Sequence, residues 1–272
     1  MVFASGQDQT RTGKVDLEMS LLNKTLSVAL LMLALVGQGV VQAQEIKLDK
    51  APVKFDNATL QQGAKLFVNY CLNCHSASAL RYNTLTQIGL TEQQIMDNLM
   101  FTADKSGEQM IVALRRDDAR KWFGVAPPDL SVVARARASE LGSGPDWLYT
   151  YLRSFYRDDS RPTGWNNVVF PNVGMPHALW SLQGVQDARF AEVDDGTGKK
   201  VQHLAGLELT QPGQLSKQEY DEQVASLVSF LTWMGEPGQE TRHALGWVVL
   251  AVLSVLAIFS YLLKRAFWKD VH

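Results

Sequence analysis

The feature that most constrains this chain is the short stretch 71–75, which reads Cys-Leu-Asn-Cys-His. Two cysteines three positions apart, with a histidine directly after the second, form the attachment signature of c-type haem. The two thiols can add across the two haem vinyl groups, and the imidazole that follows can become an axial ligand of the iron. Cys71 and Cys74 are the only cysteines in the chain, so no other thiol site competes for them. We therefore expect covalently bound haem. A lone disulfide or a redox Cys-x-x-Cys is the alternative, and the adjacent His75 argues against it.

One histidine leaves the other axial position of the iron to be filled. Met175 lies in a loop between Gly174 and Pro176, a context that can aim a side chain at a metal. The other methionines outside the terminal apolar segments lie in helical or capping contexts, where a flexible gap-filler is the usual role. His177 is the main rival and would give a haem with two histidine ligands. Methionine ligation raises the reduction potential relative to such a pair. We expect His75 and Met175 to be the two ligands of the metal.

The first part of the chain predicts an export signal. Residues 1–18 are polar and featureless, and we expect them to be an extension of the gene model that precedes a true start at Met19. Residues 19–43 combine a short basic region, a modest apolar run and small residues ending at Ala43. This pattern is typical of a cleaved secretory signal peptide. A retained N-terminal anchor is the alternative.

The other end predicts a membrane anchor. Residues 244–263 are apolar and uncharged, and about 20 such residues cross a bilayer as a helix. Residues 235–238 read Gly-Glu-Pro-Gly and predict a helix stop and hinge just before this segment. The tail 264–272 carries three basic residues, which places the C-terminus in the cytoplasm by the positive-inside rule. We expect a single-pass protein of the bacterial inner membrane, in contact with lipid, with its main domain in the periplasm.

Residues 44–239 would form that exported domain, mainly α-helical with long loops and few strands. Apolar residues recur at helical spacing along 57–70 and 146–156. Capping boxes at Thr91 and Ser216 predict the starts of two more helices. The net charge of −2 gives no reason to expect a nucleic-acid partner.

Several motifs together resemble the cytochrome c1 family, from about Asp49 to the C-terminus. They are the haem motif followed by Arg81 and Tyr82, the segment 126–131 (Ala-Pro-Pro-Asp-Leu-Ser) followed by Arg135 and Arg137, the Gly174-Met175-Pro176 loop and the single C-terminal anchor. The haem motif is shared by all c-type cytochromes, whereas the segment 126–131 with its arginines is far more specific. The resemblance implies a cytochrome c-like haem domain on one C-terminal transmembrane helix.

The resemblance also assigns residues to the haem. It makes Cys71 and Cys74 the thioether attachments and His75 and Met175 the axial ligands, and it places Pro127 and Pro128 against the haem. It further places Arg137 near a haem propionate, where a guanidinium can pair with a carboxylate as a fork. A solvated helix face is the alternative for Arg135 and Arg137. The loop between Arg137 and Trp147 departs from the mitochondrial pattern, so no contact is carried over there.

The implied function is one-electron transfer, since a haem with both axial positions filled has no site for oxygen or peroxide. In the family, a Rieske iron–sulfur subunit reduces the haem beside cytochrome b. The haem then reduces a soluble or membrane-bound cytochrome c, within the quinol–cytochrome c reductase complex. No catalytic chemistry of its own is expected for the chain. The alternatives are an anchored monohaem carrier outside that complex, and a peroxidase or oxidase subunit. A second haem motif or further cysteines, which these enzymes would need, are absent from the sequence.

A mildly acidic stretch could steer a basic partner. It comprises Asp187, Glu192, Asp194 and Asp195. Arg189, Lys199 and Lys200 lie in the same stretch, so an ordinary solvated loop is an equal alternative.

Overall fold

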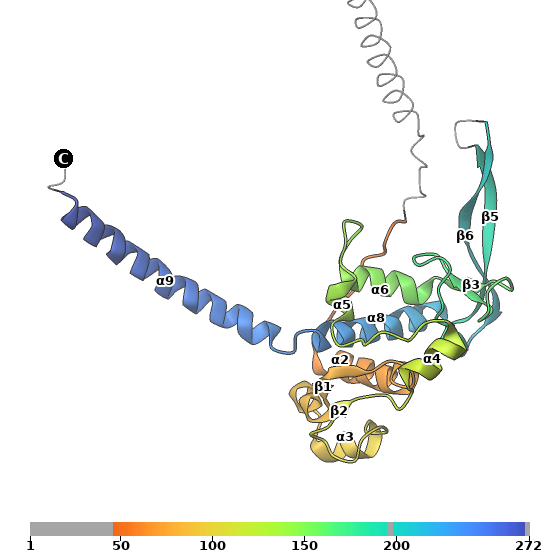
Figure 1. Ribbon diagram of the computed structural model, residues 1–272, viewed down its shortest axis with the longest axis horizontal. Helices are drawn as coiled ribbons and strands as arrows, with labels where there is room; N and C mark the ends of the chain where they lie inside the picture. Colours follow the sequence, from red (N-terminus) through yellow and green to blue (C-terminus); the bar gives the residue numbers. More distant parts are fainter. Residues whose placement is uncertain (1–45, 195–197, 270–272) are drawn as a thin grey trace, which may run out of the picture. The chain divides into compact units, whose positions relative to one another are not determined.

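The computed structural model describes residues 46–194 and 198–269 (Figure 1). The expected extension 1–18 and signal peptide 19–43 lie outside the described residues, as do Asp195 and the last three residues of the chain. The main domain is predominantly helical, as the sequence predicts. The helices are α2 (Asn57–Leu66), α3 (Glu92–Asn98), α4 (Arg116–Phe123), α5 (Val133–Ala136), α6 (Gly144–Arg153), α7 (Trp180–Gln183), α8 (Lys217–Met234) and α9 (Gln239–Phe267).

Two less regular helical segments lie before and after the first strand. A π-helical turn, Phe67–Cys71, continues α2 directly into the haem motif, and a 3-10 helix, Tyr82–Ile88, follows the first strand. The predicted helix 57–70 is thus confirmed, with its last turn widened. The haem motif therefore begins at the end of a buried helix rather than in a free loop.

In the described residues, the strands form three two-stranded antiparallel sheets. They are β1 (Ala77–Arg81) with β2 (Gln109–Met110), β3 (Phe155–Arg157) with β4 (Trp165–Asn167), and β5 (Gly184–Asp194) with β6 (Lys200–Pro212). The β5–β6 hairpin pairs from Gly184–Pro212 to Asp194–Lys200, with register shifts after Val185 and after Arg189. The alternative of a solvated loop was therefore wrong about the loop, because Asp187, Glu192 and Asp194 lie on β5, where Glu192 and Asp194 are exposed.

The predicted helix 146–156 also needs a correction. It begins at Gly144, is capped by the Ser143 side chain and ends at Arg153. Phe155 continues the apolar spacing of the helix but lies in β3 and is completely buried. Aromatic residues favour strands when a partner strand is available, and β4 provides it.

The core forms where α8 packs between α2 and α6 (Figure 1). Among its fully buried side chains are Phe67, Tyr220, Leu227 and Phe230. The Tyr220 hydroxyl donates to the backbone oxygen of Leu152 at 2.8 Å, which ties α8 to the end of α6. Both predicted capping boxes, at Thr91 and Ser216, are present and begin α3 and α8.

The predicted anchor corresponds to α9. Its segment Thr241–Phe267 is long and apolar enough to cross a membrane, and a window of 18 residues within it has a mean hydropathy of 2.4. The helix stop predicted at 235–238 is confirmed, because α8 ends at Met234 and Gly238 precedes the first residue of α9.

Candidate haem site

The imidazole of His75 is oriented by a backbone carbonyl from another segment. Its Nδ1 lies 2.7 Å from the oxygen of Pro128, and only 8% of the residue is exposed. A carbonyl can only accept, so Nδ1 carries the proton and Nε2 keeps its lone pair for a metal. Burial lowers the pKa of His75, and the Pro128 carbonyl opposes that shift in part. His75 is therefore a neutral imidazole with one nitrogen ready to ligate.

The segment 126–131 is fixed against the chain that follows His75. The Leu130 N–H donates to the backbone oxygen of Ser76 at 2.8 Å. The Asp129 carboxylate accepts from the Ser78 N–H at 2.9 Å, and the Ser131 hydroxyl accepts from the Ala79 N–H at 2.9 Å. Burial acts to raise the pKa of Asp129, but these and neighbouring hydrogen bonds from serines lower it overall. The polar members of this motif thus hold the Pro128 carbonyl in place.

Cys71 is the last residue of the π-helical turn, and Cys74 lies in the tight turn that follows it; both are partly buried. Burial raises the pKa of the Cys71 thiol to about 12 and also raises that of Cys74. The thiols are therefore protonated at neutral pH. Addition to a vinyl group uses such a thiol, since the sulfur bonds to one carbon and the hydrogen is delivered to the other.

The loop that carries Met175 packs against the chain that leads into Pro127. A Cβ added at Gly174 would lie 3.1 Å from Cγ1 of Val125 and 3.4 Å from the oxygen of Phe123. The Met175 side chain is half-buried, and its sulfur accepts a hydrogen bond from the Tyr151 hydroxyl at 3.3 Å. The segment that holds His75 therefore also supports the loop of Met175.

His177 lies in a different environment from Met175. Its ring stacks on Phe155 with 4.8 Å between the centroids, and it meets the ring of Trp165 edge-on at 5.1 Å. Burial lowers its pKa to about 4, opposed in part by the Gln183 side chain. No partner of its Nε2 in the described part of the chain satisfies hydrogen-bond geometry. The imidazole is held within an aromatic layer and is only 2% exposed, whereas Met175 is half-buried.

Arg137 lies over two aromatic rings. Its guanidinium carbon lies 4.4 Å from the ring centroid of Trp147 and 5.5 Å from that of Phe170. The side chain of Arg135, by contrast, is exposed and pairs with Glu236 at 3.4 Å. Among the described residues no carboxylate lies within ion-pair distance of Arg137. The guanidinium of Arg137 is thus positioned by stacking, and its N–H groups can pair with an anion such as a propionate.

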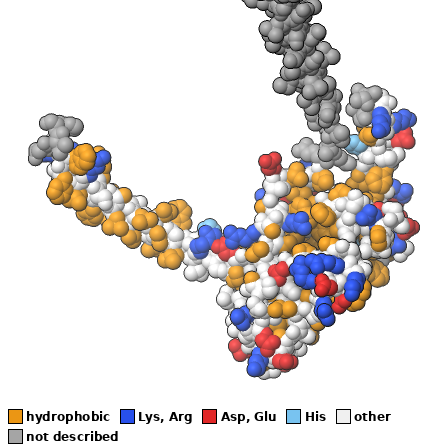
Figure 2. All heavy atoms as spheres, viewed as in Figure 1, with side chains coloured by type: hydrophobic (Ala, Val, Ile, Leu, Met, Phe, Trp, Pro, Cys, Tyr) orange, Lys and Arg blue, Asp and Glu red, His pale blue; other side chains and the backbone are white. Residues whose placement is uncertain are grey.

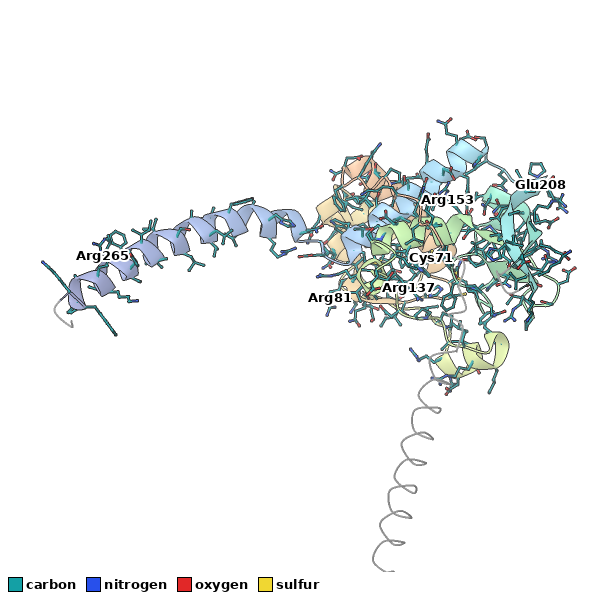
Figure 3. All side chains as sticks on the ribbon, turned by 90° about the horizontal axis from the view of Figure 1, so that it is seen from above. Cys71, Arg81, Arg137, Arg153, Glu208 and Arg265 are labelled. Carbon is teal, nitrogen blue, oxygen red and sulfur yellow. The ribbon has the colours of Figure 1, made fainter. Side chains whose placement is uncertain are left out.

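A chain of contacts links two of the predicted site residues, Arg137 and Met175. The ring of Trp147, beneath Arg137, stacks on Tyr151 at 4.7 Å, and Tyr151 in turn reaches Met175. Cys71 and Arg137 project onto the same part of the domain in Figure 3. Hydrophobic side chains gather on the face of the domain shown in Figure 2. This set of two thiols, an imidazole, a thioether and an unpaired arginine fits a covalently bound haem.

Sequence reasoning missed three residues of this site. They are Asp129 and Ser131, which hold the Pro128 segment, and Tyr151, which reaches Met175. The polar residues of the segment 126–131 were a possible signal for the first two. Tyr151 gave no signal, because an aromatic residue on a helix face is usually core.

A family model and several named proteins are similar to this chain. Residues 47–206 and 214–271 match the model of the Cytochrome C1 family. A protein of Allochromatium vinosum named cytochrome c1 is 49% identical over 218 residues, which are 80% of this chain and 86% of that protein. A protein of Nitrosomonas europaea named ammonia monooxygenase gamma subunit is 46% identical over 250 residues, 92% of this chain and 98% of that protein. A protein of Bradyrhizobium diazoefficiens named cytochrome b/c1 is 25% identical over 260 residues, 80% of this chain and 34% of that protein.

Proposed function

This chain belongs to the cytochrome c1 family, and from that premise we propose that it carries single electrons from a Rieske iron–sulfur protein to a cytochrome c. Membership of the family makes it a haem-bearing electron carrier of the bc1 complex, with haem c as its cofactor. The Rieske donor and the soluble or membrane-bound cytochrome c acceptor are the specific part of the proposal.

The observation that carries the proposal is the arrangement of two different axial donors. The Pro128 carbonyl orients His75 so that Nε2 is available, and the Tyr151 hydroxyl holds the sulfur of Met175. The haem supplies an iron that can gain and lose one electron. His75 and Met175 would hold the iron from this chain, and a haem held in this way would favour electron transfer over chemistry that needs an open metal position.

The remaining residues attach and shield the cofactor in this proposal. Cys71 and Cys74 form the thioether bonds, and Pro127 and Pro128 pack against the haem edge beside His75. Arg137, stacked on its aromatic neighbours, pairs with a propionate and lowers the cost of burying that carboxylate.

We further propose that α9 crosses the bacterial inner membrane once, with the haem domain in the periplasm. The long apolar helix supports a single span, and Lys264 and Arg265 at its C-terminal end support a cytoplasmic tail. Cytochrome b and the Rieske subunit would be its partners in the membrane. The Bradyrhizobium relative, whose name joins cytochrome b and cytochrome c1, supports the first of these.

The name of the Nitrosomonas relative offers a second candidate, a subunit of an ammonia monooxygenase. Purification of the full-length protein in mild detergent, followed by haem spectra, separates the two. We expect b-type haem and an iron–sulfur subunit to copurify with this chain. Copurification with an oxygenase would support the second candidate, and purification without cytochrome b would leave an anchored carrier that acts alone.

The site assignments are tested on the same purified protein. Met175→Leu should remove the absorption of the thioether–iron bond at the red edge of the visible spectrum, whereas His177→Ala should retain it. A denaturing gel stained for haem should lose its signal when Cys71 and Cys74 are both replaced by alanine. Retention of the red-edge band in Met175→Leu would contradict the proposed ligand.

A further inference from the structure

We infer that Tyr151 is a positioning residue for the sixth ligand, and that the hydrogen bond from its hydroxyl to the sulfur of Met175 raises the reduction potential of the haem. The inference rests on the proposed ligation by Met175. The observation that supports it directly is the distance of 3.3 Å between the Tyr151 hydroxyl oxygen and Sδ of Met175. A thioether sulfur has two lone pairs, so one can bind the iron while the other accepts this hydrogen bond.

The hydroxyl is held in place by the packing of its ring. Tyr151 is only 7% exposed. Trp147, one helical turn earlier on α6, stacks on it at 4.7 Å with an angle of 14° between the planes. Phe155 meets its other side edge-on, with 5.0 Å between the centroids and an angle of 67°. Neighbours on two sides leave the ring little freedom to rotate, so the position of the hydroxyl is set by the fold rather than by the ligand.

A hydroxyl at this position needs an explanation that packing does not give. The surroundings are aromatic, and a phenylalanine would fill the same space without bringing a polar group. Burying a hydroxyl without a partner costs free energy, which is why buried tyrosines usually find one. Here the partner is the sulfur of Met175. The sulfur is a weak acceptor, so the bond does more to orient the sulfur than to stabilise the fold.

The sign of the effect follows from the direction of the O–H dipole. Its positive end points at the sulfur, where it withdraws electron density from the donor and lies close to the metal. Both effects favour the reduced iron over the oxidised iron, since hydrogen bonds around a ligating sulfur tune the potential in this sense. Loss of one hydrogen bond corresponds to about a threefold to tenfold change in an equilibrium constant. The equilibrium constant for reduction should therefore fall by about that factor when the hydroxyl is removed.

The test is a redox titration of the full-length holoprotein carrying Tyr151→Phe, with Tyr149→Phe as the matched control. Tyr149 lies on the same helix and is also buried, but its ring packs under Arg153 at 4.3 Å. We expect a lower midpoint potential and a red-edge band that is retained but shifted in Tyr151→Phe, and neither change in the control. An unchanged potential in Tyr151→Phe, with normal haem content, would overturn the inference.

A second readout does not depend on any variant. Resonance Raman spectra of the unaltered protein should show a shift of the iron–sulfur stretch after full exchange into D2O, because the bonded hydroxyl becomes deuterated. No shift would overturn the inference. If the unaltered protein lacked the thioether–iron band altogether, the proposed ligation by Met175 would fail first. If the band were present but insensitive to Tyr151→Phe and to D2O, only the role of Tyr151 would fail.

Discussion

Replacing Gly63 by alanine is expected to loosen the crossing of α2 and α8, the contact that supports the helix leading into the haem motif. A Cβ at this position would lie 2.2 Å from the backbone oxygen of Ser226 and 2.5 Å from Cβ of Phe230. Both atoms belong to the rigid part of α8, so no change of rotamer relieves the contact. The two helices have to separate by about 1 Å to restore ordinary packing.

The net magnitude comes from two opposing effects. Alanine favours the helix by about 1 kcal/mol relative to glycine. Overpacking at a close contact costs about 1–3 kcal/mol, and separation also weakens the pairing of Phe67 with Phe230, whose ring centroids lie 5.6 Å apart. We expect a net loss of about 1–2 kcal/mol, which lowers the Tm by about 2–8 °C in a domain of this size.

Thermal unfolding of the detergent-solubilised holoprotein, followed by tryptophan fluorescence, measures this shift. Gly107→Ala is the matched control, because a Cβ at Gly107 would meet no atom within 4 Å. The control should unfold within about 1 °C of the unaltered protein, as surface substitutions do. A Tm of Gly63→Ala equal to or above that of the unaltered protein would refute the packing argument.

Three further substitutions test separate stabilising contacts, each by urea unfolding of the holoprotein. Ser216→Ala removes the cap of α8 and should lower the free energy of unfolding by about 1 kcal/mol, with Ser216→Asp restoring most of it; equal midpoints for Ser216→Ala and the unaltered protein would contradict this. The guanidinium of Arg153 pairs with the carboxylate of Asp221, whose side chain is 25% exposed, with 2.6 Å between Nε and Oδ1. Arg153→Ala removes this partner and should lower the free energy of unfolding by about 1–3 kcal/mol. Arg153→Lys should recover only part of this loss, because an ammonium cannot form the fork, and full recovery would show that charge alone suffices. Burial opposes ionisation of Asp146, but hydrogen bonds, led by the one from the Ala51 N–H, lower its pKa below the ordinary 3.8. The ionised Asp146 therefore stabilises the fold above the pKa that this carboxyl has in the unfolded chain, and this stability is lost as the pH falls through its lower pKa in the folded protein. From about pH 5 to about pH 2 the unaltered protein should lose more free energy of unfolding than Asp146→Asn. Parallel curves for the two proteins would contradict the assignment to Asp146.

Features that depend on neighbouring residues were predicted correctly from the sequence. The capping boxes at Thr91 and Ser216 each use a side chain three positions later, and both are present. The helix stop at 235–238 and the long apolar helix are local in the same sense. Covalent haem could also be inferred locally, since the motif and its family require haem c.

Features that depend on a distant partner were missed or assigned to the wrong secondary structure. A solvated loop was an alternative for the segment around Asp187 because basic residues are mixed with the acidic ones along it, and only pairing with β6 makes it a strand. Phe155 continued the helical spacing of α6, yet it pairs with Asn167 on β4. The contact between Tyr151 and Met175 spans 24 positions, so no window along the sequence reveals it.

The same dependence on distant partners sets the orientation of both proposed ligands. His75 is oriented by a carbonyl 53 positions away, and Met175 by a hydroxyl 24 positions away. Neither contact involves the haem, so both donors are aimed by the fold itself. Because the hydrogen-bond donor or acceptor beside each ligand is rigid, a change of one charge on the iron requires little movement of the surrounding protein. Fixed dipoles of this kind lower the reorganisation that accompanies a change of charge, which is the property that a carrier of single electrons needs. In the proposed site, the Pro-Pro-Asp-Leu-Ser segment would contribute to electron transfer in this way through its backbone, which Asp129 and Ser131 hold by hydrogen bonds to the N–H groups of Ser78 and Ala79.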